Sequence, residues 1–472
     1  MRNNYFFEAK NIHFIGIGGM GVSALANLAL AWGKKVSGSD LTYSDQIASL
    51  EEKGAKFFLG HLGKNIKENT DLVIYSSAVP EDNAERKRAK EKNIPQASYF
   101  QVLGEISRKW PTIAIAGTHG KSTTTALIGL LLEKAGLNPL VILGAKVRSW
   151  GSNFFCAQNP SYFVVEACEW NANFLSIFPD YLVLTNLEEE HLDYYQDIFH
   201  LRKTFEAFIG QIKKGGFLIF NSDDKNLSAL NLPKKRISYG FNQADLIAKN
   251  IISESGKQQF DLVYQRKIIR RLQFRGFGVF NVYNALAATC LGLALGINIE
   301  TVRKVFENFQ GLSRRFEILG KLKGKDVIVV SDYAHHPTAL CLTIQAARRS
   351  FPKRRIFLVY QPHQRNRTKK LFEKFLNSFW EADFVILSEV YSVAGREKKE
   401  NVSSMDLVQA IKNASKFGRT PLKNILFAKD LKETYKLIQK NILPGDLLLI
   451  VGAGNICKIA DQLDLEEMKE YN

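Results

Sequence analysis

The central segment of this sequence is Pro111-Thr-Ile-Ala-Ile-Ala-Gly117-Thr-His-Gly120-Lys121-Ser122-Thr-Thr-Thr125. An apolar run typical of a strand leads into two glycines, a lysine and a hydroxyl residue, and a long helical pattern follows. In such a loop backbone N–H groups approach phosphates, the new helix points its N-terminus at them, and the lysine neutralises their charge. The spacing departs from the standard phosphate-binding loop, because Ile115 stands where its first glycine is expected. The pattern nevertheless predicts an ATP site. The residues assigned to it from this segment are Gly117, Thr118, His119, Gly120, Lys121, Ser122 and Thr123.

Polar residues also follow the next two predicted strands. One apolar run ends at Glu166, and the run 181–184 leads into a polar segment that contains His191. The carboxyl ends of parallel strands meet at one edge of an open α/β sheet, which is where ligands bind. An acid at that edge suits magnesium, and a histidine there is more useful as a ligand than as a structural residue. The sequence therefore predicts Ser122, Glu166 and His191 as metal ligands.

A second nucleotide-binding pattern opens the chain. A short apolar strand leads into a glycine motif, a helical run follows, and a second strand ends in an acid. A further strand, 71–75, ends in small hydroxyl residues. This is typical of a Rossmann-type βαβ unit, in which the glycines contact a diphosphate and the acid lies near the ribose or base. NAD, FAD and UDP-sugars all fit such a unit. The residues assigned to it are Gly16, Gly18, Gly19, Gly21, Asp40, Ser76 and Ser77.

The remainder of the chain continues the alternation of strands and polar turns. A helix of small residues begins near two amides, and a hinge with two arginines precedes the last third of the chain. There, strands predicted at 327–330 and 356–360 lead into clusters that contain three histidines. Zinc is disfavoured at these clusters, because they contain no cysteine and the chain predicts a magnesium-ATP enzyme. The residues singled out here are Asn281, Asn284, Arg315, Asp332, His335, His336 and His363.

Length and composition indicate an ordinary globular protein. The 472 residues are 46% apolar and 24% charged, which suggests about three domains of roughly 100–200 residues each. We predict an α/β protein with a Rossmann-like domain at 1–108, a central P-loop domain with a mostly parallel sheet at 109–318, and a C-terminal Rossmann-like α/β domain at 319–472. Five scattered cysteines and the absence of a long apolar run favour a cytoplasmic protein without membrane insertion. The net charge of +17 is spread along the chain, and anionic small substrates explain it as well as nucleic acid does.

Taken together in their order, these motifs resemble those of the Mur ligases of peptidoglycan synthesis. The resemblance runs from about residue 11 to residue 455. It includes Gly16 to Gly21, Gly117 to Ser122, Thr185 to His191, Asp332 to Pro337 and Gln361 to His363. The first glycine motif and the histidine clusters are most similar to those of the member that attaches L-alanine to UDP-N-acetylmuramate. The alternative is the member that reattaches recycled murein tripeptide, although its motifs differ at Gln361-Pro-His363.

The resemblance implies an ATP-dependent, peptide-bond-forming ligase that works through an acyl phosphate, with ATP and Mg²⁺ as cofactors. It implies Lys121, Glu166 and His191 as catalytic residues, with His191 at a second magnesium. The first domain would bind the UDP-substrate, and Asn281, Asn284, Arg315 and Asp332 would contact ATP. His335, His336 and His363 would lie on the amino-acid side. The expected partners are UDP-N-acetylmuramate and L-alanine, without nucleic acid, and the expected state is a monomer or homodimer.

Some residues depart from the family pattern. Cys168 replaces an aspartate in Glu166-Ala-Cys168-Glu169, Ser122 replaces a threonine, and Ala339 replaces a glutamate. Glu206 stands where other members of the family carry a carbamylated lysine. Two other classes of function compete with the ligase, namely a nicotinamide oxidoreductase built on Gly16 to Gly21 and a basic P-loop protein that acts on nucleic acid. The first leaves the Lys121 loop without a role, and the second predicts clustered arginines with exposed aromatic residues, which the sequence lacks.

Overall fold

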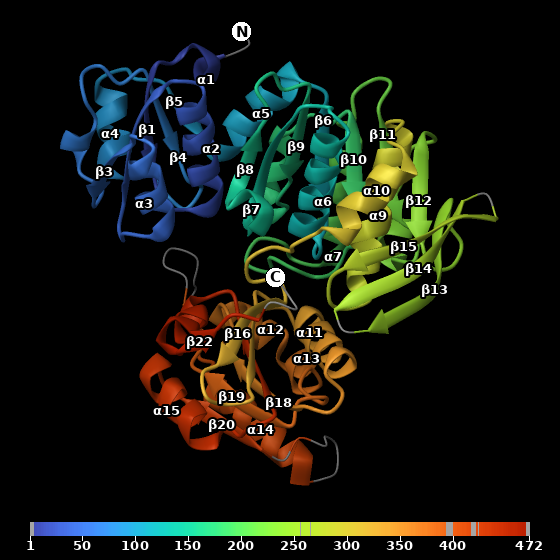
Figure 1. Cartoon of the computed structure of the whole chain (residues 1–472). Coiled ribbons are helices and arrows are strands. Elements are labelled where there is room, and N and C mark those ends of the chain that lie inside the picture. Colours follow the sequence, from blue (N-terminus) through green and yellow to red (C-terminus); the bar gives the residue numbers. More distant parts are fainter. Residues whose placement is uncertain are drawn as a thin grey trace.

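The computed structural model describes residues 4–254, 256–264, 266–392, 400–416, 422 and 424–468. Three β-sheets follow one another along these residues, and helices pack around each sheet. Figure 1 shows the first sheet in blue, the middle one in green, and the third in orange and red beneath the middle one. The predicted α/β class with mostly parallel sheets is therefore confirmed. The boundaries near residues 108 and 318 stay a proposal.

The first sheet has the strand order β3-β2-β1-β4-β5, and all neighbouring strands are parallel. Its strands are β1 (Asn11–Ile15), β2 (Lys35–Asp40), β3 (Lys56–Leu59), β4 (Leu72–Tyr75) and β5 (Gln96–Ser98). Its helices are α1 (Tyr5–Glu8), α2 (Met20–Ala31), α3 (Asp45–Glu52), α4 (Ala84–Glu91) and α5 (Tyr99–Lys109), with the short η1 (Gly63–Asn65). Because β2, β1 and β4 are neighbours, the glycine motif, Asp40 and Ser76 meet at one edge. This is the doubly wound arrangement expected of a Rossmann-type unit.

The middle sheet has the order β15-β14-β13-β12-β11-β10-β6-β9-β7-β8. Its strands are β6 (Thr112–Ala116), β7 (Pro139–Val147), β8 (Ser152–Cys156), β9 (Tyr162–Glu166), β10 (Tyr181–Leu184), β11 (Phe217–Asn221), β12 (Arg236–Gly240), β13 (Leu246–Glu254), β14 (Lys257–Tyr264) and β15 (Lys267–Arg275). Its helices are α6 (Lys121–Lys134), α7 (Ile198–Ile209), α8 (Lys225–Ser228), α9 (Phe280–Ala294) and α10 (Ile299–Glu307), with the short η2 (Arg148–Trp150) and η3 (Trp170–Ser176). β6 is buried along its whole length. Alternate residues of this strand enter two different cores, as is typical of a parallel sheet covered on both faces.

The third sheet has the order β20-β19-β18-β21-β17-β16-β22, and β16 is antiparallel to both of its neighbours, β17 and β22. Its strands are β16 (Glu317–Leu322), β17 (Ile328–Asp332), β18 (Arg355–Tyr360), β19 (Phe384–Ser388), β20 (Ile425–Ala428), β21 (Asp446–Val451) and β22 (Leu465–Glu466). Its helices are α11 (Pro337–Ser350), α12 (Arg365–Lys370), α13 (Phe372–Leu376), α14 (Ser404–Lys416) and α15 (Leu431–Asn441), with the short η4 (Asn455–Gln462). The ends of β17, β18 and β21 face the middle sheet, which brings the histidine clusters toward the phosphate-binding loop.

The antiparallel edge of the middle sheet was not predicted. β13, β14 and β15 pair as successive antiparallel neighbours. β15 ends at Arg275, and α9 begins at Phe280. Charged residues interrupt the apolar alternation in Lys267-Ile-Ile-Arg-Arg. Lysine and arginine on an exposed edge strand discourage pairing with another chain, and they weaken the periodic signal by which strands are recognised.

A buried polar network fastens the first sheet to α4. Glu85 is fully buried, and its carboxylate accepts hydrogen bonds of 2.6 Å from both Ser39 and Asn65. His13 and His61 lie 3.5 and 3.4 Å from the same carboxylate. Burial alone raises the pKa of Glu85, but the bonds from these groups outweigh it and lower the pKa from 4.5 to about 2.

We expect Glu85→Gln to destabilise the protein by about 1–3 kcal/mol at neutral pH, because it leaves buried donors poorly satisfied. A carboxyl group whose pKa is lowered by folding stabilises the protein above its unfolded pKa and ceases to do so as the pH falls through the folded value. The difference in unfolding free energy between the two proteins should therefore shrink between pH 4.5 and about 2. Urea titrations at several pH values measure it. A constant difference across that range would contradict the assignment.

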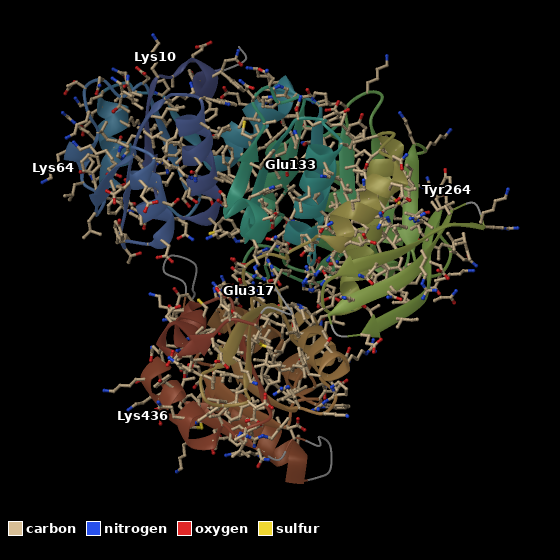
Figure 2. All side chains as sticks on the ribbon, viewed as in Figure 1. Lys10, Lys64, Glu133, Tyr264, Glu317 and Lys436 are labelled. Atoms are coloured by element: carbon tan, nitrogen blue, oxygen red, sulfur yellow. The ribbon has the colours of Figure 1, made fainter. Side chains whose placement is uncertain are left out.

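None of the helices in the described part of the chain has the length and apolar character that crossing a membrane requires. The basic side chains are dispersed, as the sequence indicated. Figure 2 shows Lys10 and Lys64 on the outer surface of the first part and Lys436 on the outer surface of the third.

Candidate active site

The phosphate-binding loop follows β6 and is braced by the segment after β10. Thr118 donates its backbone N–H to the Asn186 carbonyl at 3.1 Å, and His119 donates to the Asn186 side chain at 2.8 Å. Gly120 has φ +81°, and a Cβ there would lie 2.3 Å from the Asn284 side-chain oxygen. Only glycine meets both constraints. The loop therefore ends in a left-handed residue that aims the N-terminus of α6, with its unpaired first-turn N–H groups, into the cleft.

Lys121 and Ser122 each meet an acid from the segment after β9. The Lys121 ammonium lies 3.0 Å from the buried Glu169 carboxylate and also donates to the carbonyls of Gly117 and Thr118. Ser122 donates its hydroxyl to Glu166 at 2.9 Å. Burial disfavours both charges of the Lys121–Glu169 pair, but their attraction outweighs it, so the pKa of Lys121 is raised and that of Glu169 is lowered. Both groups are therefore charged at neutral pH.

His191 lies beside the same acid. Its imidazole Nε2 is 3.4 Å from Glu169 Oε1, and its backbone has φ +53°. A positive φ is uncommon for a residue other than glycine and marks a constrained turn. Burial favours the neutral ring, but hydrogen bonds to Cys168 and Glu169 outweigh it and raise the pKa of His191 to about 10. β10, β6 and β9 are neighbours in the sheet, so the predicted meeting of Lys121, Glu166 and His191 at one edge is confirmed.

α9 contributes the two predicted amides. Asn284 donates to Asn281 at 2.9 Å and accepts from Thr124 at 3.2 Å. Asn281 in turn donates to the Phe277 carbonyl at 2.7 Å. The pair thus lies directly beside the phosphate-binding loop, as the sequence indicated, and both amides already have protein partners.

The third part of the chain faces this loop across the cleft. Arg315 donates to the Ser122 hydroxyl at 3.4 Å. Asp332 is buried and accepts from the backbone N–H groups of Phe316 and Ala334 at 2.6 and 2.7 Å. Burial raises the pKa of Asp332. This carboxylate therefore holds the turn that carries Arg315, besides lining the cleft.

A run of three glutamates connects the two sides. Glu188 lies 3.3 Å from His119 and 3.5 Å from His336. Glu189 pairs with Lys374 at 3.0 Å, and Glu190 with Arg367 at 2.5 Å. Burial opposes the Glu188 charge, but the hydrogen bond with His119 outweighs it and lowers the pKa of Glu188 to about 2. Burial also lowers the pKa of His336 to about 4, so this histidine is neutral at neutral pH.

The cleft has a volume of about 620 Å³. Most of the residues predicted for ATP, metal and amino acid line it together. These are Thr118, His119, Gly120, Lys121, Ser122, Thr123, Glu166, His191, Asn281, Asn284, Arg315, Asp332, His335, His336 and His363. The loop glycine Gly117 lies behind them, where a Cβ would meet the Thr185 hydroxyl at 2.2 Å. The structure thus gathers these residues around one cleft between the middle and third sheets. Glu317, labelled in Figure 2, lies at the junction of these two parts and accepts a hydrogen bond from the Arg314 backbone at 2.8 Å.

The residues predicted for the UDP-substrate lie elsewhere. Gly16, Gly18, Gly19, Gly21, Asp40, Ser76 and Ser77 follow β1, β2 and β4 of the first sheet and are outside the cleft lining. The Asp40 carboxylate accepts from the backbone of Gly18 at 2.9 Å and of Leu41 at 2.7 Å. Asp40 therefore shapes the glycine turn in this structure. Its contact with a ribose or base stays a prediction.

Several residues of the cleft were not assigned a role from the sequence. Glu169, Glu188, Glu190 and Arg367 line it. Glu169 and Glu190 are only 1% and 5% exposed. Charged side chains are seldom buried unless they are paired, but their partners lie 48 and 177 residues away. The signal in the sequence that could have indicated these residues was the presence of several acids directly after two predicted strands.

Comparison with known proteins covers nearly the whole chain. The model for the Mur ligase family, catalytic domain, matches residues 11–111, that for the Mur ligase middle domain matches 115–292, and that for the Mur ligase, glutamate ligase domain, matches 314–454. The UDP-N-acetylmuramate–L-alanine ligase of Caldanaerobacter subterraneus subsp. tengcongensis is 38% identical over 467 residues, which cover 98% of each chain.

Solved structures agree. The UDP-N-acetylmuramate–alanine ligase of Thermotoga maritima matches with a TM-score of 0.81 and 27% identity, over 96% of this chain and 98% of that one. A MurF ligase of Thermotoga maritima in complex with ADP shares the fold, with a TM-score of 0.60 and 16% identity, over 90% of this chain and 93% of that one. Since the family models together match most of the chain and a relative is 38% identical along 98% of it, the chain belongs to the Mur ligase family.

Proposed function

We propose that this protein joins L-alanine to the lactyl carboxylate of UDP-N-acetylmuramate in an ATP-dependent reaction of peptidoglycan precursor synthesis. One observation carries the proposal. A phosphate-binding loop faces an arginine and three histidines across a single cleft, in a chain whose relatives along its full length bear the name of that ligase. The names of these relatives favour ligation of L-alanine over reattachment of murein tripeptide, which was the alternative considered from the sequence.

The chemistry follows from the cleft. The lactyl carboxylate attacks the γ-phosphorus of ATP, ADP leaves, and an acyl phosphate forms. The amine of L-alanine then attacks the acyl carbon, loses a proton, and expels phosphate from the tetrahedral intermediate. Phosphoryl transfer depends mainly on positioning and charge neutralisation. Lys121 would leave Glu169 to contact the β- and γ-phosphates, and Arg315 would contact them from the opposite side. The ADP bound by the related MurF ligase is consistent with a nucleotide at this loop.

Magnesium fits the residues at the end of β9. Ser122 and Glu166 already share a hydrogen bond of 2.9 Å, and both offer the oxygen ligands that this hard cation prefers. His191 would hold a second ion, and its ring would lose its proton on binding. The cations would neutralise the phosphate oxygens and the reacting carboxylate. Ser122, Glu166 and His191 would thus orient the phosphates against the carboxylate.

Arg367 supplies a guanidinium on the amino-acid side of the cleft. Arg367 donates to the His363 carbonyl at 3.0 Å and is held by Glu190. A guanidinium in this setting suits the carboxylate of an amino acid. Ala339 and Leu342 add an apolar lining beside it. We assign this region, with His335, His336 and His363, to L-alanine, and the edge with Gly16 to Gly21 to the UDP group.

A phosphate-release assay tests the function. It combines UDP-N-acetylmuramate, ATP and magnesium with single amino acids or with the murein tripeptide. We expect turnover with L-alanine. Turnover with the tripeptide alone would overturn the proposal in favour of the recycling ligase. UDP-sugar or NAD binding, measured on the full chain, separates the ligase from the oxidoreductase considered above, and salt-sensitive DNA binding would revive the nucleic-acid alternative.

We expect activity to be independent of bicarbonate. A carbamylated lysine supplies carboxylate-like oxygens to magnesium in other members of the family, but Lys203 and Glu206 are absent from the described lining of this cleft. Glu206 instead accepts from the Asn231 backbone at 2.9 Å, and neither residue lines the cleft, so His191 would hold the second ion alone. Turnover is measured in buffer stripped of carbon dioxide, with and without added bicarbonate. Rescue by bicarbonate that vanishes in Lys203→Ala would refute the expectation.

A further inference from the structure

Three side chains of different chemistry converge beside Lys121. Cys168, Glu169 and His191 offer a thiol sulfur, a carboxylate oxygen and an imidazole nitrogen, all within 4.8 Å of one another. Glu169 is buried, and the other two side chains are half-buried. In a tetrahedral zinc site the ligand atoms are separated by roughly 3.5 Å, given the usual metal–ligand lengths. Small side-chain adjustments would therefore bring these three atoms around one ion.

The two loops that carry these residues are fastened to each other. Tyr195 donates its hydroxyl to the Glu169 carbonyl at 2.5 Å, and Trp170 donates its indole N–H to Asp193 at 3.0 Å. His191 lies in a constrained turn with φ +53°. Glu169 Oε2 lies 3.0 Å from the Lys121 ammonium but accepts no hydrogen bond. The ligand atoms are thus held near one another before any ion arrives, and one carboxylate oxygen retains bonding capacity.

We propose that Cys168, Glu169 and His191 bind a thiophilic divalent cation, with Zn²⁺ as the prototype. A thiolate and an imidazole select such ions, whereas magnesium prefers oxygen ligands alone. Three protein ligands leave the fourth position of a tetrahedral ion to water or phosphate. Bound Zn²⁺ takes the carboxylate that pairs with Lys121 and the imidazole assigned to magnesium, and it thereby inhibits ligation. The binding of Zn²⁺ does not depend on the proposed ligase function, whereas the inhibition does.

Cobalt titration of the full chain, without nucleotide, tests the binding. Cobalt(II) replaces zinc in such sites, and its bond to a thiolate gives a charge-transfer absorption band in the near ultraviolet. We expect this band in the wild type and in Cys156→Ser, a control with another half-buried thiol, and its loss in Cys168→Ser. Absence of the band from folded wild type, or its persistence in Cys168→Ser, would overturn the site. Binding at His119, Glu188 and His336, which also lie within 4.8 Å, produces no thiolate band.

Zinc inhibition is then compared between the wild type and Cys168→Ser in phosphate-release assays with excess magnesium. The rate of each protein with zinc is divided by its own rate without zinc. Loss of the thiolate ligand should raise the inhibitory zinc concentration by roughly tenfold or more, since even the loss of an outer-shell partner costs about 10–100-fold in metal affinity, and a chelator should restore the rate. Equal sensitivity of the two proteins would overturn the inhibitory role. A wild type without ligase activity that still shows the cobalt band would refute the proposed function and leave the site in place.

Discussion

Lys121→Ala should reduce ligation by roughly a thousandfold while leaving UDP-N-acetylmuramate binding intact. Loss of one group aimed at transition-state charge costs about 10²–10³ in rate, and Lys121 is the cation of the phosphate-binding loop. The residues assigned to the UDP group lie at the edge of the first sheet and outside the cleft. Phosphate release measures the first effect, and calorimetric titration with UDP-N-acetylmuramate measures the second.

This substitution also removes the ammonium partner of the buried Glu169 carboxylate, which keeps His191 at 3.4 Å. Removing one member of a buried ion pair costs about 3–5 kcal/mol, so thermal unfolding must accompany the assay. The double variant Lys121→Ala/Glu169→Gln removes both charges and is the matched control for stability. If the folded double variant no longer bound the UDP-substrate, the separation of the two binding regions would be wrong.

Most of the fold could be predicted from local patterns in the sequence. β6 was predicted from the apolar run that leads into the glycine loop. The predicted meeting of Lys121, Glu166 and His191 followed from a general property of parallel sheets, in which carboxyl ends share one edge. Neither inference needed information about distant parts of the chain.

The paired charges could not be found in this way. Arg367 and Glu190 are separated by 177 residues, and no periodicity links them. The hydrogen bond from the Phe316 backbone to Asp332 spans 16 residues and depends on the pairing of β16 with β17. The hydrogen bond from the Gly18 backbone to the Asp40 carboxylate was likewise not indicated by the sequence, and the contact of Asp40 with a ribose or base stays a prediction. Hydrogen bonds to backbone groups leave little trace in residue type, since many side chains can make them.

The run Glu188 to Glu190 offers a comparison between neighbouring ion pairs of different burial. Glu190 and Arg367 are 5% and 7% exposed, whereas Glu189 and Lys374 are 40% and 54% exposed. Burial opposes the charge of Glu190, but Arg367 outweighs it and holds the pKa of Glu190 well below its usual range. An exposed pair contributes about 0–1 kcal/mol, while breaking a buried pair costs about 3–5 kcal/mol. Both pairs join the same two parts of the chain, but only Glu190 and Arg367 also line the cleft, so burial and position both predict the larger effect for the Glu190 pair.

We therefore expect Glu190→Ala to lower kcat/KM for L-alanine by roughly a hundredfold, since 3 kcal/mol corresponds to a factor of that size. Glu189→Ala should remain within about threefold of the wild type.

Because ligands contact both sides of the cleft, the wild type should become more compact with an ATP analogue and UDP-N-acetylmuramate together. Small-angle scattering should show this compaction in Glu189→Ala and its loss in Glu190→Ala. Equal behaviour of the two variants would mean that the buried pair does not hold the third domain against the middle one.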